Sequence, residues 1–206
     1  EVLSGELPVL ELPADYPRPP VQRFEGDQVS LVIDRELTEA IRTTASQSAA
    51  TVYMVLLAAY SILLAKHAGQ EDIIVGSPMA GRTHSDLENM LGVFVNTLAM
   101  RSRPEGTKTF ADYLQEVKKA ALQAYENQNY PFEQLVEKLN LRREASRNPL
   151  FDAMLVFQTM NREETRVSDS VFRPFEFKHP TAKFDLTCNA KEINGEIHVV
   201  FVYCTS

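Results

Sequence analysis

The feature that most limits how this chain can fold is an apolar run from Val52 to Ala65, interrupted only by Ser61. The run has fourteen residues, which is too short to cross a hydrocarbon layer of about 30 Å, so we expect no membrane span. Thr51 suits an N-cap and Gly69 suits the position after a helix end, so the sequence predicts a helix over 52–68. Because apolar side chains surround its axis, we expect this helix to lie in the core of a globular domain.

Composition agrees with a globular domain and excludes some partners. The chain has 206 residues and 23.2 kDa, enough for one domain or for part of a larger one. Acidic residues outnumber basic ones by 28 to 21, which argues against a general nucleic-acid binder, since phosphate binding needs clustered Lys and Arg. The chain begins without Met and without a basic segment before an apolar core. This start predicts no signal peptide and indicates a fragment of a longer protein.

The remaining pattern alternates helices and strands. Five prolines in residues 1–25 predict an extended lead-in, namely Pro8, Pro13, Pro17, Pro19 and Pro20. Helices are expected over 34–49, with Asp34 as N-cap and Leu37 and Ile41 on one face, and over 52–68. A third is expected over 109–127, with Thr109 as N-cap. A fourth is expected to start at Pro131, with Phe132, Leu135, Val136 and Leu139 pointing inward. Strands are expected over 29–33, 72–75, 93–101, 152–158, 171–177, 184–193 and 196–203, with a loop over 76–90 and an exposed connection over 160–170. This order predicts a mixed α/β or α+β domain, with helices packed on a mixed sheet.

The pair Asn194-Gly195 lies between two alternating runs and predicts a two-residue hairpin turn in which Ile193 faces Glu196. In that register Cys188 faces Phe201, while Cys204 lies opposite Asp185. The two cysteines are therefore not partners, and we expect both thiols to be reduced, as in a cytoplasmic protein.

The usual catalytic signatures do not occur in the sequence. It lacks G-x-S-x-G, a Walker loop, G-x-G-x-x-G and H-E-x-x-H, and it has no C-x-x-C pair for zinc. His67 is followed four residues later by Glu71, and His84 by Glu88, but His67 suits a helix end and His84 suits a solvated loop. None of the four histidines predicts a general base, these being His67, His84, His179 and His198.

Three segments carry more information than the histidines. They are LGVFVNTLAMR at 91–101, NQNYPFEQLVEKL at 127–139 and RREASRNPLFDAMLVFQ at 142–158. In this order they resemble the motifs of the condensation domains of nonribosomal peptide synthetases. The lead-in LPADYPRPP at 12–20 and the stretch from 51 to 82 are similar to the same family, so the resemblance covers nearly the whole chain.

This resemblance implies a chloramphenicol-acetyltransferase-like subdomain, one half of a two-lobed domain with a tunnel between the lobes. In that family the first lobe carries a histidine motif, HHxxxDG, whose second His assists the attack of the acceptor amine on the donor thioester. No His here is preceded by a second His or followed by Asp-Gly at that offset, so the chain resembles the second lobe. We therefore expect a lead-in over 1–25 and a C-terminal subdomain over 26–206, which stops before the family's last helix.

Two polar residues have alternative interpretations. The resemblance implies that Arg82 pairs with the Asp of the histidine motif in the other lobe, as structural support for the active site; otherwise Arg82 is a solvated loop residue. Asn96 interrupts an apolar strand and is expected either to satisfy backbone groups or to line the tunnel.

The other motif residues are interpreted as architectural. Pro131 and Glu133 suit the first turn of a helix, Asn148 before Pro149 suits an extended turn, and Arg147 can anchor that turn through carboxylates or carbonyls. The full architectural set is Gly92, Phe94, Tyr130, Pro131, Phe132, Glu133, Arg147, Asn148 and Pro149.

The resemblance implies part of an enzyme that joins an acyl or peptidyl donor to an aminoacyl acceptor. Both substrates would be carried on the phosphopantetheine of partner carrier domains, with no cofactor bound directly and with an adenylation domain in the same synthetase. We expect this chain alone to be inactive, because the histidine motif is absent from it. The alternatives are half of an epimerisation or heterocyclisation domain, a non-catalytic module that docks carrier proteins, and a free-standing acetyltransferase, which the missing motif disfavours.

Overall fold

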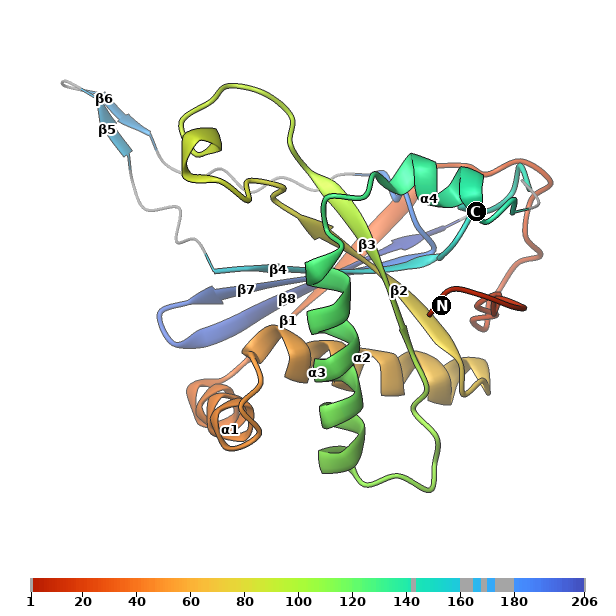
Figure 1. The fold of residues 1–206 in the computed structure, drawn as a ribbon, viewed down its shortest axis with the longest axis horizontal. Coiled ribbons are helices and arrows are strands. Elements are labelled where there is room, and N and C mark those ends of the chain that lie inside the picture. Colours follow the sequence, from red (N-terminus) through yellow and green to blue (C-terminus); the bar gives the residue numbers. More distant parts are fainter. Residues whose placement is uncertain (1, 142–143, 160–164, 168–169, 173–179, 206) are drawn as a thin grey trace.

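A computed structural model describes residues 2–141, 144–159, 165–167, 170–172 and 180–205. Its centre is a six-stranded sheet in the order β1-β8-β7-β4-β2-β3, and β5 and β6 form a separate two-stranded sheet (Figure 1). The strand β4 is parallel to both β2 and β7, and the other pairs are antiparallel. The elements are β1 (Gly26–Ile33), α1 (Arg35–Gln47), α2 (Val52–Ala68), β2 (Ile73–Met79), a 3₁₀ turn η1 (Ser85–Leu87), β3 (Asn96–Ser102), α3 (Phe110–Glu126), α4 (Phe132–Lys138), β4 (Ala153–Gln158), β5 (Thr165–Val167), β6 (Ser170–Phe172), β7 (Leu186–Ile193) and β8 (Glu196–Cys204).

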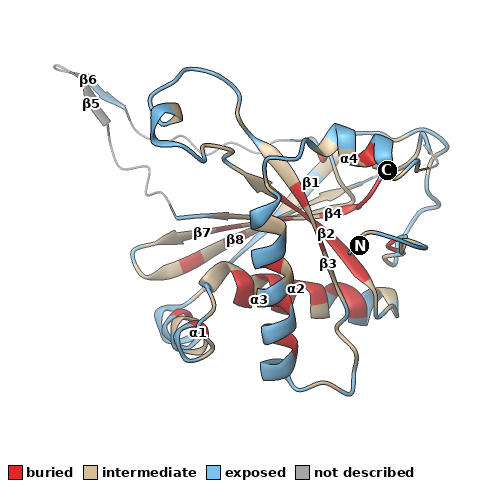
Figure 2. Cartoon of the chain, in the orientation of Figure 1, coloured by how far each residue is buried: buried red, intermediate tan, exposed pale blue. Residues whose placement is uncertain are grey.

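Helices α1, α2 and α3 lie on one face of the sheet and enclose the main core (Figures 1 and 2). The predicted caps are confirmed: the side chains of Asp34, Thr51 and Thr109 each accept a hydrogen bond from a backbone N–H of the first turn. Gly69 has φ 65° and ends α2, a conformation that glycine adopts without steric cost.

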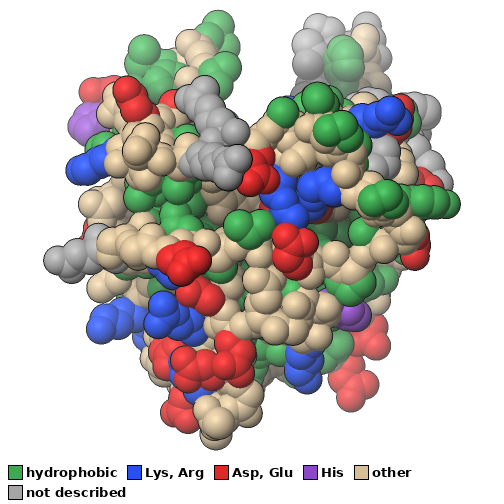
Figure 3. All heavy atoms as spheres, turned by 90° about the vertical axis from the view of Figure 1, so that its right-hand side faces the viewer, with side chains coloured by type: hydrophobic (Ala, Val, Ile, Leu, Met, Phe, Trp, Pro, Cys, Tyr) green, Lys and Arg blue, Asp and Glu red, His purple; other side chains and the backbone are tan. Residues whose placement is uncertain are grey.

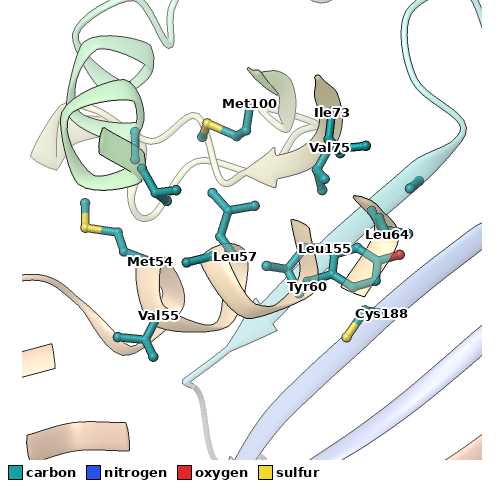
Figure 4. Close-up of a cluster of buried hydrophobic side chains, with 14 of the residues drawn as sticks. Met54, Val55, Leu57, Tyr60, Leu64, Ile73, Val75, Met100, Leu155 and Cys188 are labelled. Atoms are coloured by element: carbon teal, nitrogen blue, oxygen red, sulfur yellow. The ribbon is translucent and has the colours of Figure 1, made fainter. Parts of the chain in front are cut away.

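Helix α2 contributes most to this core, as its all-round apolar sequence predicts. Eight of its residues are buried, and Leu57 and Leu64 point toward β2, β3 and β4 (Figure 4). One side still faces solvent, where Leu63 is 41% exposed. Leu37 of α1 is also exposed, and α1 buries Thr38 and Ala45 in its place.

A smaller core lies on the opposite face, at the end of the sheet where α4 packs. Its buried members are Ile74, Leu150 and Phe151, and the ring of Phe132 lies 5.4 Å from that of Phe151. The α4 side chains predicted to point inward do so: Val136 is buried, and Phe132, Leu135 and Leu139 pack on this cluster.

The predicted hairpin is confirmed in its register. Ile193 pairs with Glu196 and Cys188 pairs with Phe201. The N–H of Cys204 donates to the carbonyl oxygen of Asp185 at 3.1 Å. Cys188 is buried in the main core, and burial raises the pKa of its thiol to about 12, which keeps it a poor nucleophile.

Two boundaries around the 76–90 loop differ from the prediction. The strand β2 continues through Gly76, Ser77 and Pro78 to Met79 instead of ending at 75. Gly76 is required there, because a Cβ atom at this position would overlap the ring of Phe151. The next strand begins at 96 rather than 93, because residues 93–95 belong to the loop described below.

Other differences lie at helix ends and in the segment before β7. Helix α1 ends at Gln47 rather than 49. The predicted connection over 160–170 contains β5 and the first residue of β6, and its positions 160–164 and 168–169 lie outside the described residues. The predicted strand 171–177 coincides with β6 only at 171–172, and positions 173–177 also lie outside them.

Among the described residues, no single helix combines the length and hydropathy needed to cross a bilayer. Helices α1 and α2 pass that test only when taken together, and they meet at a bend of 105°.

Candidate functional site

The motif residues gather around two places on the sheet. Residues 80–95 form a loop between β2 and β3, and Asn96, the first residue of β3, contacts the turn before α4. The segment 144–152 precedes β4 and contacts the lead-in. The motifs therefore form two local clusters.

The loop 80–95 is closed at its base by Gly81 and Phe94. Gly81 has φ 65°, and a Cβ atom there would overlap the carbonyl oxygen of Phe94. Gly92 has φ 156° and lies against the ring of Phe94. Both positions need glycine, for backbone conformation and for close approach.

Arg82 holds the inside of this loop. Its guanidinium donates to the carbonyl oxygens of Leu87 and Gly92 and lies 4.5 Å from the centre of the Phe94 ring. The guanidinium of Arg82 therefore stabilises the loop from within, through hydrogen bonds and a cation–π contact. Arg82 has no acidic partner among the described residues, so its pairing with an Asp of another lobe stays a prediction.

The outer side of the loop is strongly apolar and uncovered. Leu91 is 101% exposed and Val93 is 93% exposed, and Met90 and Val95 are also exposed. Isolated exposed apolar residues are ordinary, but several on one braced loop indicate a contact surface.

Asn96 joins the loop to the turn before α4. Its Nδ2 donates to the carbonyl oxygens of Gln128 at 2.7 Å and Tyr130 at 2.8 Å, and its Oδ1 accepts from the N–H of Phe132 at 3.1 Å. This geometry is the first of the two alternatives for Asn96, the one that satisfies backbone groups. A role in lining a tunnel stays a prediction.

The turn that Asn96 holds starts α4. Pro131 has φ −61° and is the N-cap residue, so the helix begins one residue later than the sequence predicts. Glu133 is exposed in the first turn, where its charge suits the helix dipole. The ammonium of Lys138 lies 5.9 Å from the ring of Tyr130, which is itself exposed.

Arg147 lies at the centre of the second cluster, where the segment 144–152 contacts the lead-in. It donates to the carboxylates of Asp152 at 3.0 Å and Glu11 at 2.6 Å and to the carbonyl oxygen of Leu10 at 3.0 Å. Only 12% of the Arg147 side chain is exposed, and only 5% of that of Asp152. Asn148 donates to the carbonyl oxygen of Lys183 at 3.0 Å and so ties the same segment to the residues before β7.

Asp152 is the most deeply buried carboxylate of this cluster. Burial and the negative charge of nearby Asp185 raise its pKa, and the guanidiniums of Arg147 and Arg18 oppose the rise. Its Oδ1 is buried and accepts no hydrogen bond from the described residues. The charge of Asp152 therefore depends on its two cationic neighbours.

Sequence reasoning missed several partners in this network. Arg18 in the lead-in binds Asp185 through both nitrogens of its fork, and Arg101 binds Asp72, whose pKa is lowered mainly by that hydrogen bond. Arg101 closes the first motif segment, which is the one sequence signal that pointed to it.

No described histidine forms an acid–base centre. His67 is exposed in the last turn of α2, and the Nδ1 of His84 accepts from the N–H of Asp86 at 3.3 Å in a solvated turn. His198 lies 3.8 Å from Glu196 on β8, and His179 lies outside the described residues. Within the described ranges, no three His, Cys, Asp or Glu side chains are grouped to bind a metal ion.

Comparisons with known proteins agree with the motif segments. The family model described as "Condensation domain" matches residues 1–206. The chain is 50% identical over 204 residues to bacitracin synthase 3 of Bacillus licheniformis, which covers 99% of this chain and 3% of that protein. It is 50% identical over 202 residues to tyrocidine synthase 3 of Brevibacillus parabrevis, covering 98% of this chain and 3% of that protein. The chain thus spans a small part of these relatives.

Solved structures share the fold. A four-domain nonribosomal peptide synthetase, crystallised with AMP and glycine, superposes with a TM-score of 0.89 at 25% identity, over 96% of this chain and 16% of that one. The condensation domain of the monacolin K polyketide synthase MokA superposes with a TM-score of 0.81 at 22% identity, over 97% of this chain and 48% of that one. The expected fold class, helices on a mixed sheet in a chloramphenicol-acetyltransferase-like subdomain, is confirmed.

Proposed function

The chain belongs to the condensation-domain family, and we propose that it is the second lobe of such a domain in a nonribosomal peptide synthetase. The complete domain joins an acyl or peptidyl donor to an aminoacyl acceptor, both tethered to the phosphopantetheine of carrier domains in the cytoplasm. An adenylation domain of the same synthetase supplies the activated amino acid. Catalysis in such a domain comes mainly from holding two tethered substrates together, with a His from the other lobe for proton transfer.

The observation that carries this proposal is the family match over all 206 residues. The coverage of 48% of a solved condensation domain supports the assignment to one lobe of two. The sheet face opposite α1–α3 also supports it. There Asn189, Val200 and Ser30 are paired neighbours that are only half-buried or exposed, which suits a surface that faces another lobe.

The first prediction concerns activity. Residues 1–206 alone are expected to form no amide above background when mixed with loaded donor and acceptor carrier proteins, while the complete domain forms it. The measurement is the amount of condensed product released from the acceptor carrier, by mass spectrometry. Amide formation by residues 1–206 alone would contradict the proposal.

The second prediction concerns the apolar loop. Replacing Leu91 and Val93 together by Ser is expected to lower amide formation by the complete domain at least tenfold, because these side chains are proposed to pack on the other lobe. The same change is expected to leave the unfolding midpoint of residues 1–206 unaltered, since both side chains are already in solvent.

Leu63→Ser is the matched control for this loop, because Leu63 is also exposed but lies on α2. It is expected to leave amide formation by the complete domain unchanged. Full activity of the loop variant in the complete domain would show that the loop is not a contact with the other lobe.

A further inference from the structure

Residues 2–22 follow the side of the domain without a helix or strand of their own, and side chains of the folded core hold their backbone. Arg101 donates to the carbonyl oxygens of Val2 at 3.1 Å, Ser4 at 3.4 Å and Glu6 at 3.1 Å, while Asp72 fixes its guanidinium. One arginine thus binds three alternate carbonyl groups of this segment.

Gln70, just after α2, continues this arrangement. Its Oε1 accepts from the N–H of Glu11 at 3.0 Å, and its Nε2 donates to the carbonyl oxygen of Val9 at 2.8 Å. The side-chain amide of Gln70 therefore accepts from one backbone N–H and donates to one backbone carbonyl oxygen, as the backbone of a neighbouring strand would. Arg147 binds the next two positions, through the carbonyl oxygen of Leu10 and the carboxylate of Glu11.

The far end of the segment uses its own side chains. Arg18 donates to the carbonyl oxygen of Ser146 at 3.1 Å and to Asp185. The N–H of Gln22 donates to the carbonyl oxygen of Ala145 at 2.7 Å, and its side chain donates to that of Lys183 at 3.0 Å. The whole segment is therefore held in one register by polar contacts.

Apolar contacts add to this attachment. Leu10 is the only fully buried residue among positions 2–22, while Leu3, Leu7 and Leu12 are partly buried against the two cores, and most of the other residues are exposed. A cavity of about 250 Å³ lies under the segment, between Leu7–Leu10 on one side and Ile73, Arg147 and Asp152 on the other. The charged residues that line this cavity are of both signs, Arg147 with Asp72, Glu144 and Asp152, which suits peptide groups and mixed charges better than a polyanion. Acidic and basic side chains are also intermixed on the face of the molecule turned to the viewer in Figure 3.

We propose that this groove is a docking surface for an extended peptide, and that its occupant, residues 2–22 of the same chain, is a releasable strap. The strap leaves the groove in an opening that keeps the sheet and the helices folded. It has no hydrogen-bonded ladder or helix of its own, and most of its residues are exposed, which are properties of segments that open locally. Release uncovers the cavity and the Arg147–Asp152 pair.

The test weakens the strap without touching the groove. In residues 1–206 with both Glu11→Gln and Arg18→Gln, the backbone amides of positions 11 and 22, whose N–H groups donate to Gln70 and Ala145, are expected to exchange with deuterium at least tenfold faster than in the unchanged chain. Amides of α2, β4 and β8 are expected to keep their rates. Asp15→Asn is the matched control, because it removes one exposed charge from the same segment, and it is expected to change nothing.

A second measurement uses a fluorescent peptide of residues 2–22 added to the same chains. It is expected to bind the Glu11→Gln, Arg18→Gln chain at least tenfold more tightly than the unchanged chain, in which the strap competes within the molecule. A peptide that carries the same two changes is expected to bind at least tenfold more weakly than the unaltered peptide. Equal binding to both chains, no binding to either, or strap amides that exchange only at the rate of the core would each overturn the proposal.

Discussion

Replacement of Arg147 by Met is expected to lower the free energy of unfolding of residues 1–206 at pH 7 by about 3–5 kcal/mol. Methionine keeps much of the side-chain volume, so the change removes mainly the guanidinium. The carboxylate of Asp152, of which 5% is exposed, then keeps only the more distant charge of Arg18. A buried charge that loses its partner is much more costly than the pair is stabilising.

The loss in the free energy of unfolding caused by Arg147→Met, called the deficit below, depends on pH through the pKa of Asp152. Burial already raises that pKa above the value of an unfolded aspartate, 3.8, and loss of Arg147 raises it further. A carboxyl group whose pKa is raised in the folded state makes a stabilising contribution to the free energy of unfolding. This contribution is fully present below the pKa of the unfolded state and is lost as the pH rises through the pKa of the folded state. The deficit of the Met variant is therefore expected to be largest at pH 7 and to shrink as the pH approaches 4.

Urea unfolding of four chains measures this effect: the unchanged chain, Arg147→Met, Asp152→Asn and the double variant. The double variant is expected to be more stable than Arg147→Met at pH 7, since it no longer buries an unpaired charge. Arg42→Met is the control, because Arg42 also binds two carboxylates but at the surface, and its effect is expected to be much smaller. A deficit that does not change between pH 7 and pH 4 would show that Asp152 is not its source.

Local chemistry explains which parts of the fold were predictable. The caps at Asp34, Thr51 and Thr109 and the turn at Asn194-Gly195 depend on residues within a few positions of each other, and each is confirmed. The end of β2 was not predictable, because Gly76 and Pro78 suggest a loop. The residue that makes Gly76 necessary, Phe151, is 75 positions away in sequence (151 minus 76).

The candidate site was predictable as a set of motif residues but not as a network. Arg147 was expected to anchor its own turn, whereas it also binds the lead-in, and Arg18 meets Asp185 across 167 positions. Such pairs leave no periodic signal, because each partner only needs to reach the other in the folded state. The same reason kept the two alternatives for Asn96 open.

Asn96 shows how one polar side chain couples three segments that are apart in sequence. It begins β3, follows the apolar loop, and binds both sides of the turn at 128–132. Replacement by Ala is expected to lower the free energy of unfolding by about 2–3 kcal/mol, since two carbonyl oxygens and one N–H lose their partner. The position of α4 and the base of the loop therefore depend on the same amide.

Asn96→Asp is expected to be more destabilising at pH 7 than Asn96→Ala, although it changes a single atom. One carboxylate oxygen can still accept from the N–H of Phe132. The other replaces the Nδ2 donor and faces two carbonyl oxygens, which lie 2.7 and 2.8 Å from that nitrogen, so hydrogen bonds become repulsion. Because protonation restores a donor, the Asp variant is expected to regain stability as pH falls toward 4, whereas the Ala variant is not. Urea unfolding at pH 7 and pH 4 measures both, and Asn129→Asp, an exposed change in the same turn, serves as the control. Equal stability of the Asp and Ala variants at both pH values would mean that water, and not Asn96, satisfies the carbonyl groups of the turn.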